Sequence, residues 1–476
     1  MVTANVVPLP DGFRIALDSG TRQLAADRWI GGSPTRALRL TAPGRIAWGE
    51  LSRGPVASPA AGVVARRFTD AGLAHPVPPA VDRVDVTVVI PVRDRATLLA
   101  RCLAALGGRY PILVVDDGSR EQAAVARVAA DHGATLIRRP VNGGAAAARN
   151  TGLAHVTTEL VAFVDSDCAP GPDWIDRLAG HFTDPAVAAV APRISPLAPD
   201  TWAGRYTRAA SSLDLGDRPA RVVPNTRVSY VPTAALIARR SALAAVAGHG
   251  DVFDETLRIG EDVDLVWRLH KLGWRVRYDP SVRVGHHEPR TWPGLLARRL
   301  RYGTSAAPLA IRHPRNLTHL VLRPWPALTV AALLTRRPLL AAGALALAVE
   351  STSRTLRAND IPADRVPGAV AATGQTWLGL GQYATQFAAP LLLAAMLPGG
   401  RNRWGRRAAA GSLLLGAPLA RWVRRRPALD PVRFTLGALA DDIAYGTGVW
   451  AGCLAHRTTK PLRPALGRRT ETREPQ

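Results

Sequence analysis

From residue 84 onward, short apolar runs alternate with longer segments whose apolar positions recur at helical spacing. The runs have the length of strands and are rich in β-branched residues, and they lie at 86–90, 112–115, 134–137 and 160–164. The segments between them predict helices at 98–106, 121–131 and 143–153. Because strands that alternate with helices form parallel sheets with crossover connections, the pattern predicts an α/β domain with a mainly parallel sheet over residues 84–305.

Polar residues stand where these predicted strands end. Asp116, Asn142 and Asp165 each fall at such a position, and in an open sheet of this kind ligands bind at the carboxyl ends of the strands. Asp165 and Asp167 place two carboxylates one residue apart, which suits a hard divalent cation shared with a phosphate-bearing substrate. An isolated pair of this kind is more often a solvated turn, so its interpretation depends on the other motifs of the chain.

Residues 1–80 have a different texture and predict a small separate domain with its linker. Strands are expected at 13–17 and 28–32, followed by helical patterns. This order suits a winged-helix-like fold. The proline-rich segment 75–79 is typical of a linker.

The C-terminal region, 306–458, is apolar and helical, and the polar, basic tail 459–476 is expected to be disordered. The uncharged stretch 377–397 has about the length that a bilayer crossing requires. Arginine clusters flank the apolar runs where lipid headgroups would lie. Two interpretations stay open: buried helices of a second globular domain, or helices that face a membrane, either lying flat or spanning it.

The formal net charge of +24 is concentrated at the C-terminal end. From Ala297 onward there are 26 Lys or Arg against 8 Asp or Glu, a net +18. These arginines flank apolar runs instead of alternating with aromatic residues, which favours an anionic membrane surface over nucleic acid as partner.

The cysteines and the N-terminal sequence bear on the compartment. Cys102, Cys168 and Cys453 are far apart and have neither metal-site nor disulfide spacing, which is consistent with a reducing environment. No basic segment followed by an apolar run opens the sequence, so no secretory signal is predicted. We therefore expect the catalytic domain in the cytosol, at the cytoplasmic face of the cell membrane.

Five stretches of the predicted α/β domain carry a family resemblance. They lie at 88–95, 114–119, 142–150, 165–167 and 260–265. Together they resemble the family 2 glycosyltransferases of the GT-A fold. The resemblance implies a nucleotide-sugar-binding domain and an inverting, metal-dependent transfer of a hexose.

The resemblance implies roles for several residues on the donor side. Pro91 and Arg93 would lie beside the nucleoside. Asp117 would accept a hydrogen bond from uracil N3–H, a donor that cytosine lacks. Arg149 would hold the diphosphate, for which a guanidinium is well suited, and Asp165 would orient the ribose or a bound water.

The same resemblance implies a metal site and a general base. Asp167 would coordinate Mg²⁺ or Mn²⁺, which would neutralise charge on the departing diphosphate. His286 is a candidate further ligand, with a surface histidine pair as the open alternative. Asp262 is the candidate base, because an inverting transfer needs a carboxylate to take the proton of the attacking hydroxyl; alternatively, it is a helix-start acid that interacts favourably with the helix dipole.

Three more stretches, at 9–14, 31–34 and 288–292, resemble the glycosyltransferases of mycofactocin systems. This implies UDP-glucose as donor, the small peptide-derived redox cofactor mycofactocin as acceptor, and a short β-glucan as product. The Gln-x-x-Arg-Trp signature of processive synthases does not occur in the sequence, which argues against long polymers. Two alternatives stay open: a transferase acting on a lipid or cell-wall glycan, and a catalytically dead, membrane-anchored binding protein.

Overall fold

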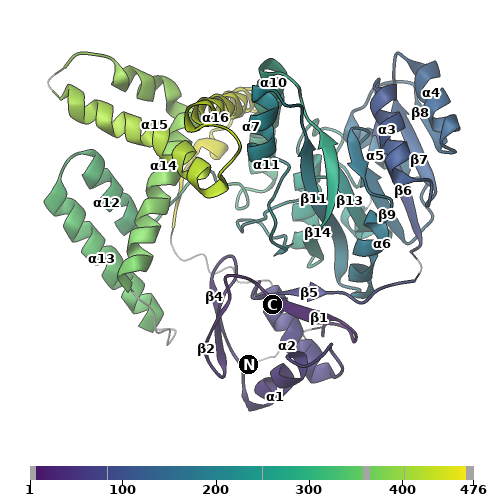
Figure 1. The fold of residues 1–476 in the computed structure, drawn as a ribbon, viewed down its shortest axis with the longest axis horizontal. Helices are drawn as coiled ribbons and strands as arrows, with labels where there is room; N and C mark the ends of the chain where they lie inside the picture. Colours follow the sequence, from purple (N-terminus) through teal and green to yellow (C-terminus); the bar gives the residue numbers. More distant parts are fainter. Residues whose placement is uncertain (1–6, 83, 249, 358–364, 401, 468–476) are drawn as a thin grey trace. The chain divides into compact units, whose positions relative to one another are not determined.

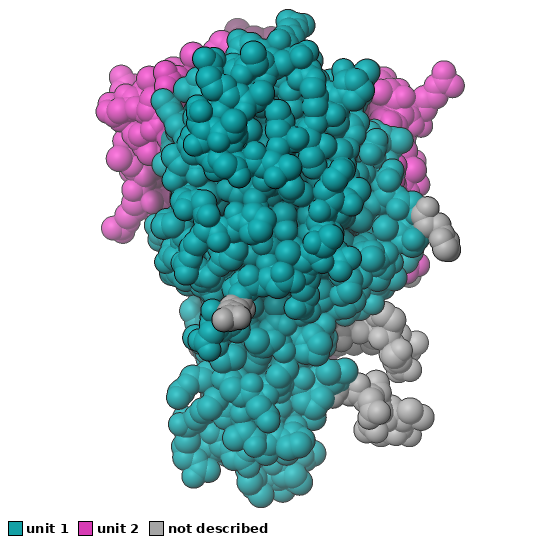
Figure 2. Space-filling model, turned by 90° about the vertical axis from the view of Figure 1, so that its right-hand side faces the viewer, with its two compact units in different colours: residues 1–197, 211–287 teal, residues 198–210, 288–476 magenta. Residues whose placement is uncertain are grey.

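The computed structural model describes residues 7–82, 84–248, 250–357, 365–400 and 402–467 (Figure 1). The chain divides into two compact units, and Figure 2 shows them in different colours. The first comprises residues 1–197 and 211–287, and the second comprises 198–210 and 288–476. The N-terminal segment and most of the expected α/β domain thus belong to the first unit.

The N-terminal elements of the first unit are short strands followed by two helices. They are β1 (Arg14–Leu17), β2 (Arg22–Ala25), β3 (Arg28–Gly31), β4 (Arg36–Arg39), α1 (Ala42–Leu51), α2 (Pro59–Asp70) and β5 (Ala74–Val77). Both helices begin with a hydroxyl cap and a proline in the first turn, which defines where they start. Strands β2, β3 and β4 pair in that order, and Trp29, Trp48 and Phe68 pack together in the core.

The strands predicted at 13–17 and 28–32 are present, whereas the winged-helix-like fold stays a prediction. The segment 75–79, predicted to be a linker, mostly forms β5, which pairs antiparallel with β1. Pro76 of β5 is tolerated because a strand at the edge of a sheet does not need every backbone N–H for hydrogen bonds to a neighbouring strand. Arg66 of α2 makes a buried two-pronged ion pair with Asp184, at 2.7 and 2.8 Å, which links α2 to the α/β part of the same unit.

Nine strands form one sheet among the described residues. The first four and their helices follow the expected alternation: β6 (Val86–Val92), α3 (Ala96–Leu106), β7 (Ile112–Asp117), α4 (Gln122–Asp131), β8 (Thr135–Arg139), α5 (Ala145–Leu153) and β9 (Leu160–Val164). The later elements are β10 (Cys168–Pro170), α6 (Trp174–Ala179), η1 (Gly180–Thr183), β11 (Val187–Leu197), β12 (Ala220–Arg221), β13 (Ala235–Arg239), α8 (Arg240–Ala247), α9 (Glu261–Lys271) and β14 (Arg275–His287).

The sheet is mixed, so the prediction of a mainly parallel sheet is confirmed for the first four strands and for the pair β11 and β14, and it was wrong for the other pairs of the second half. Its main order is β10-β14-β11-β13-β9-β6-β7-β8, with β12 paired to β14. Strands β9, β6, β7 and β8 are parallel to one another, but β13 runs antiparallel to both β9 and β11. After β9 the regular alternation of strands and helices ends, and antiparallel pairs occur beside the parallel pair β11 and β14.

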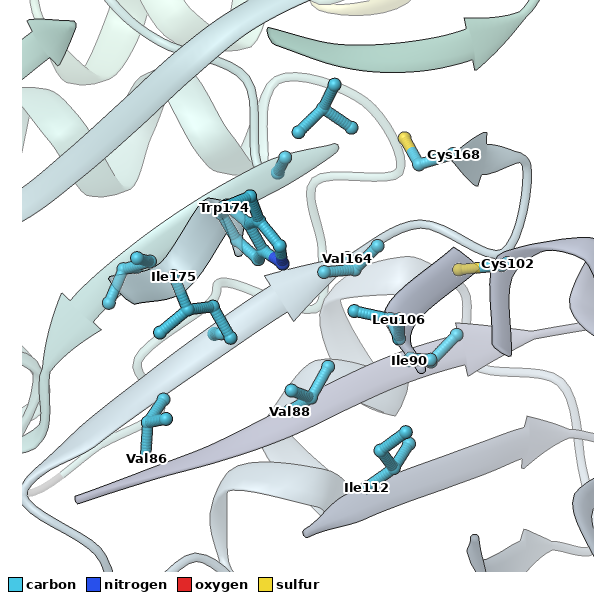
Figure 3. Close-up of a cluster of buried hydrophobic side chains, with 14 of the residues drawn as sticks. Val86, Val88, Ile90, Cys102, Leu106, Ile112, Val164, Cys168, Trp174 and Ile175 are labelled. Atoms are coloured by element: carbon cyan, nitrogen blue, oxygen red, sulfur yellow. The ribbon is translucent and has the colours of Figure 1, made fainter. Parts of the chain in front are cut away.

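A hydrophobic core lies where α3, α4 and α6 pack on the sheet. Figure 3 shows Val88 and Ile90 of β6 with Leu106 of α3, and Trp174 of α6 in the same buried cluster. On α5, a Cβ at Gly152 would lie 2.5 Å from a Val89 methyl group and 3.1 Å from one of Val115. The glycine therefore lets α5 pack closely against β6 and β7, and α5 carries residues of the site.

The second unit is mainly helical. Its elements are α7 (Trp202–Ala210), α10 (Trp292–Thr304), α11 (Ala306–Arg312), β15 (Val321–Leu322), α12 (Pro324–Leu334), α13 (Pro338–Arg357), α14 (Arg365–Met396), α15 (Arg403–Arg425), α16 (Pro431–Ala455), η2 (Lys460–Leu462) and β16 (Ala465–Leu466). A Cβ at Gly448 would collide with the Leu300 carbonyl, so this glycine permits the close packing of α16 on α10. Two buried acids of α16 are neutralised within the unit: Asp441 by Arg299 and Asp442 by Arg421, each at 2.6 Å.

The sequence led us to expect that helices of the C-terminal region face a membrane or are buried, and that the tail is disordered. No helix within the described ranges is both long and apolar enough to cross a membrane. Part of the tail expected to be disordered is ordered, because β16 pairs with β15 and Pro461 is buried. Residues 468–476 lie outside the described residues.

Candidate functional site

The turn after β9 brings Asp167 next to His286. Strand β9 is completely buried, and the Asp165 N–H donates to the Ala234 carbonyl as the chain leaves the strand. Strand β10 then pairs antiparallel with the end of β14, with Cys168 opposite His286, and the His287 N–H donates to the Asp167 carbonyl at 2.9 Å. As a result, His286 Nε2 lies 3.6 Å from Asp167 Oδ1.

This pair fits a divalent cation bound jointly with a ligand. A carboxylate and an imidazole suit Mn²⁺, and Mg²⁺ is usually bound by few protein carboxylates together with phosphate oxygens and waters. Within the described ranges no group of three His, Cys, Asp or Glu is placed to hold a metal ion by itself. The remaining ligands would therefore come from substrate and solvent. Arg95, which the sequence reasoning did not single out, donates to Asp167 Oδ2 at 2.8 Å and supplies positive charge there.

Arg149 links the same turn to the start of α9. Its guanidinium is buried and donates to Asp165 at 2.6 Å and to Glu261 at 2.8 Å. Burial alone would lower the pKa of Arg149, but the two carboxylates outweigh it, and the pKa is raised. In this structure the guanidinium thus holds two acids in place, and its predicted contact with a diphosphate stays a prediction.

Asp262 lies beside this ion-pair chain, in the first turn of α9. The helix begins after Gly260, whose φ of 89° is a left-handed conformation that glycine adopts without strain. The Asp262 carboxylate accepts from the Val263 N–H at 2.8 Å. Burial, with repulsion from Glu261, raises the pKa of Asp262 to about 7. A carboxyl group with this pKa can accept a proton near neutral pH.

The residues predicted to bind the nucleoside lie on β6 and β7 and just beyond. Pro91 pairs in register with Val115, and Arg93 comes directly after β6 with an exposed side chain. Asp117 ends β7 and is buried, and it accepts from the N–H groups of Gly143, at 2.9 Å, and Gly144, at 2.7 Å. These amides open α5, so the turn that starts this helix fixes the orientation of the carboxylate.

Arg139 also binds Asp117, with 2.9 Å between Nε and Oδ1, and the sequence reasoning missed it. The sequence does contain a pattern that could have predicted this ion pair. Asp116 and Asp117 end β7, and Arg138 and Arg139 end β8, opposite them in register. Two acids at the end of one strand and two arginines at the end of the next predict ion pairs if the strands are neighbours and parallel. Glu261 was overlooked as the partner of Arg149, although it directly precedes Asp262.

The geometry therefore brings most predicted residues together at one edge of the sheet. Asp165, Asp167 and His286 meet at the turn after β9, and Arg149 connects Asp165 to Glu261 and hence to the turn that carries Asp262. Such a group can bind an anionic ligand with a cation on one side while a carboxylate accepts a proton on the other.

The sequence is similar to those of several known proteins. Residues 87–245 match the glycosyl transferase family 2. The chain is 39% identical over 477 residues to the pre-mycofactocin glycosyltransferase of Mycobacterium tuberculosis (strain ATCC 25618 / H37Rv), covering 96% of this chain and 98% of that protein. It is also 30% identical over 237 residues to an N-acetylglucosaminyltransferase of Rhizobium meliloti (strain 1021), covering 46% of this chain and 55% of the relative.

Among solved structures, the chain is similar to a mannosyltransferase from Pyrobaculum calidifontis, PcManGT, in complex with GDP-Man and Mn²⁺. It has a TM-score of 0.44 and 22% sequence identity, and the match covers 78% of this chain and 89% of that one.

Proposed function

The chain belongs to the family 2 glycosyltransferases, and on that basis we propose that it transfers glucose from UDP-glucose to a small peptide-derived redox cofactor of the mycofactocin type. The acceptor is proposed because the 39% identity to a pre-mycofactocin glycosyltransferase extends over 96% of the chain. The product would be a short β-glucan on that acceptor.

One observation carries the proposal for the reaction: Arg149 bridges Asp165 and Glu261 at 2.6 and 2.8 Å. This bridge fixes the turn that holds Asp167 relative to the helix start that holds Asp262. In the proposed reaction Asp167 acts on the side of the leaving diphosphate, and Asp262 is a separate carboxylate for the acceptor. An inverting transfer needs this division of roles, because the acceptor attacks the anomeric carbon from the side opposite the leaving group.

In the proposed reaction the Asp262 carboxylate takes the proton of the acceptor hydroxyl. The hydroxyl oxygen forms a bond to the anomeric carbon, and the bond from that carbon to the diphosphate oxygen breaks. Since the donor is an α-glucoside, inversion yields a β-linked product. The pKa of about 7 places Asp262 where it can both accept this proton and release it to solvent near neutral pH.

Asp167 and His286 would hold Mg²⁺ or Mn²⁺. When bound, the cation would neutralise negative charge on the departing UDP. On the nucleoside side, Asp117 would accept from uracil N3–H while Pro91 and Arg93 line the base. Asp117 is suited to this role because Arg139 and two backbone amides already fix its orientation.

Incubation of the full chain with a panel of nucleotide sugars and the purified aglycone acceptor tests the proposal, with mass spectrometry of every product that gains a hexose. We expect UDP-glucose to be used, in a metal-dependent reaction that Asp167→Ala abolishes. Hexose on a lipid or cell-wall glycan, and never on the redox cofactor, would instead establish the alternative acceptor class. No turnover of any donor would contradict the assignment of the site.

A further inference from the structure

One end of the helical unit is both apolar and strongly basic. It consists of residues 333–340, around the turn between α12 and α13, and residues 390–400 and 402–407, at the end of α14 and the start of α15 (Figure 1). We call these segments the basic apolar end. Its most exposed large apolar side chains are Leu339 (89% exposed), Leu391 (73%), Trp404 (69%) and Leu397 (62%).

The exposure of the α14 end results from a break in the helix. Ala388 has non-helical backbone angles, and Pro390 lies two residues later. Proline removes a helical hydrogen bond and clashes with the preceding turn, so the helix bends there. From Pro390 to Met396 the sequence is entirely apolar, yet Leu391, Leu393 and Met396 are exposed. A helix end of this composition needs a partner that covers it.

Hydrogen bonds join the end of α14 to the start of α15, and a Cβ at Gly405 would lie 3.0 Å from the Arg336 side chain of the turn between α12 and α13. Arg406 donates to the carbonyls of Ala395, at 3.0 Å, and Leu397, at 2.9 Å. Arg407 Nε donates to the Met396 carbonyl at 3.0 Å. These arginines satisfy the carbonyls that the end of α14 leaves free. The apolar side chains are therefore presented on an ordered scaffold, and their burial would cost little further backbone entropy.

The charge of this end selects the kind of partner. Residues 333–340, 390–400 and 402–407 contain five arginines and no Asp or Glu. Trp404 lies between two of them, with the guanidinium carbons of Arg403 and Arg407 each 5.7 Å from its ring. An exposed tryptophan flanked by arginines is typical of the interface between lipid headgroups and acyl chains. A second copy of the chain is disfavoured, because a symmetric contact would bring like charges together.

We propose that the basic apolar end binds flat on an anionic phospholipid surface. Leu339, Leu391 and Trp404 enter the boundary between headgroups and acyl chains, while Arg337 and Arg403 contact lipid phosphates. This mode needs no helix to span the bilayer. It is independent of the glycosyl transfer, because none of these residues belongs to the candidate site.

Flotation of the full chain with vesicles tests the proposal. Vesicles of phosphatidylcholine alone are compared with vesicles that also contain phosphatidylglycerol. We expect the unmodified protein to float with the anionic vesicles and not with the neutral ones. Arg337→Gln and Arg403→Gln should each weaken this binding about fivefold, and the double variant Leu391→Ser, Trp404→Ser should weaken it on the order of tenfold or more.

Leu454→Ser is the matched control, because Leu454 is 76% exposed on α16, outside the basic apolar end. It should bind as the unmodified protein does, and all variants should retain transfer to a soluble acceptor. Equal binding of the double variant and the control to anionic vesicles would overturn the proposal. So would a concentration-dependent dimer that the double variant abolishes, since a second copy would then cover this surface.

Discussion

His286 Nε2 lies 3.6 Å from Asp167 Oδ1, because the antiparallel pairing of β10 with β14 places the histidine beside the turn that carries the aspartate. If the two side chains share a cation, Asp167→Asn should lower the transfer rate about a hundredfold or more, since the neutral amide is a poor ligand. Asp173→Asn, at an exposed acid near the same turn, is the control and should retain activity. Rates at saturating donor, with circular dichroism to verify folding, measure the effect. Equal activity of the two variants would exclude Asp167 from the metal site.

His286 should affect which metal works best. Imidazole favours Mn²⁺ over Mg²⁺, so we expect His286→Gln to raise the Mn²⁺ concentration for half-maximal activity about tenfold and to change the Mg²⁺ requirement less. Titration of each metal at fixed donor concentration measures both effects. Equal changes for the two metals would indicate that the histidine only supports the turn.

The pKa of Asp262 gives two dependences on pH. As a base it must be ionised, so activity should rise with pH and reach half its maximum at about pH 7. The stability of the folded protein changes with pH in the opposite direction. The folded-state pKa lies above the unfolded value of 3.8, so the folded chain binds more protons between about pH 4 and 7, and stability falls as pH rises through this range.

Asp262→Asn should abolish transfer and remove this part of the pH dependence of stability. Denaturant midpoints at pH 5 and pH 8 test the second point. A variant that is inactive but keeps the full difference between the two midpoints would show that another group titrates there.

The sequence predicted the strands whose ends carry the site, because buried β-branched runs are distinctive and Asp117 and Asp165 lie at their ends. It could not predict the ion pairs. Arg149 was expected at a diphosphate, but its partners Asp165 and Glu261 are brought together only when α5 and α9 pack near the same edge of the sheet. Strand β10 has three residues, too few for a periodic pattern, yet it positions Asp167 next to His286.

The C-terminal region shows a different limit of sequence reasoning. The uncharged stretch 377–397 suggested one continuous helix, but Ala388 interrupts it, and most residues from Pro390 onward in this stretch are exposed. The hydropathy of a segment depends only on its composition. The position of the bend depends on Pro390 and on the helices that pack against the part of α14 before it.

Arg149 should matter for stability as well as for catalysis. Arg149→Met would leave the Asp165 and Glu261 carboxylates without their shared cation, and we expect a loss of about 3 kcal/mol in the free energy of unfolding. Arg139→Met also removes an arginine that binds a carboxylate of the site, but Asp117 keeps its two backbone donors, so the loss should be smaller. Urea unfolding followed by circular dichroism compares the two, and a larger loss for Arg139→Met would contradict the assignment.

Arg277 of β14 should destabilise the protein. It is buried, and within the described part of the chain none of its three guanidinium nitrogens has a hydrogen-bond partner. Burial lowers the pKa of Arg277 to about 9, well below the ordinary value of an arginine, so above pH 9 the unfolded chain binds more protons and stability rises with pH. Below pH 9 the cost of burying the charged guanidinium does not change with pH, and Arg277→Met should raise the free energy of unfolding by about 2 kcal/mol at neutral pH.

Arg283→Met, at an exposed position of the same strand, is the control and should change the free energy of unfolding by less than about 0.5 kcal/mol. Urea unfolding of both variants measures the difference, and a loss of stability in Arg277→Met would mean that an anion or ordered water binds the guanidinium in solution.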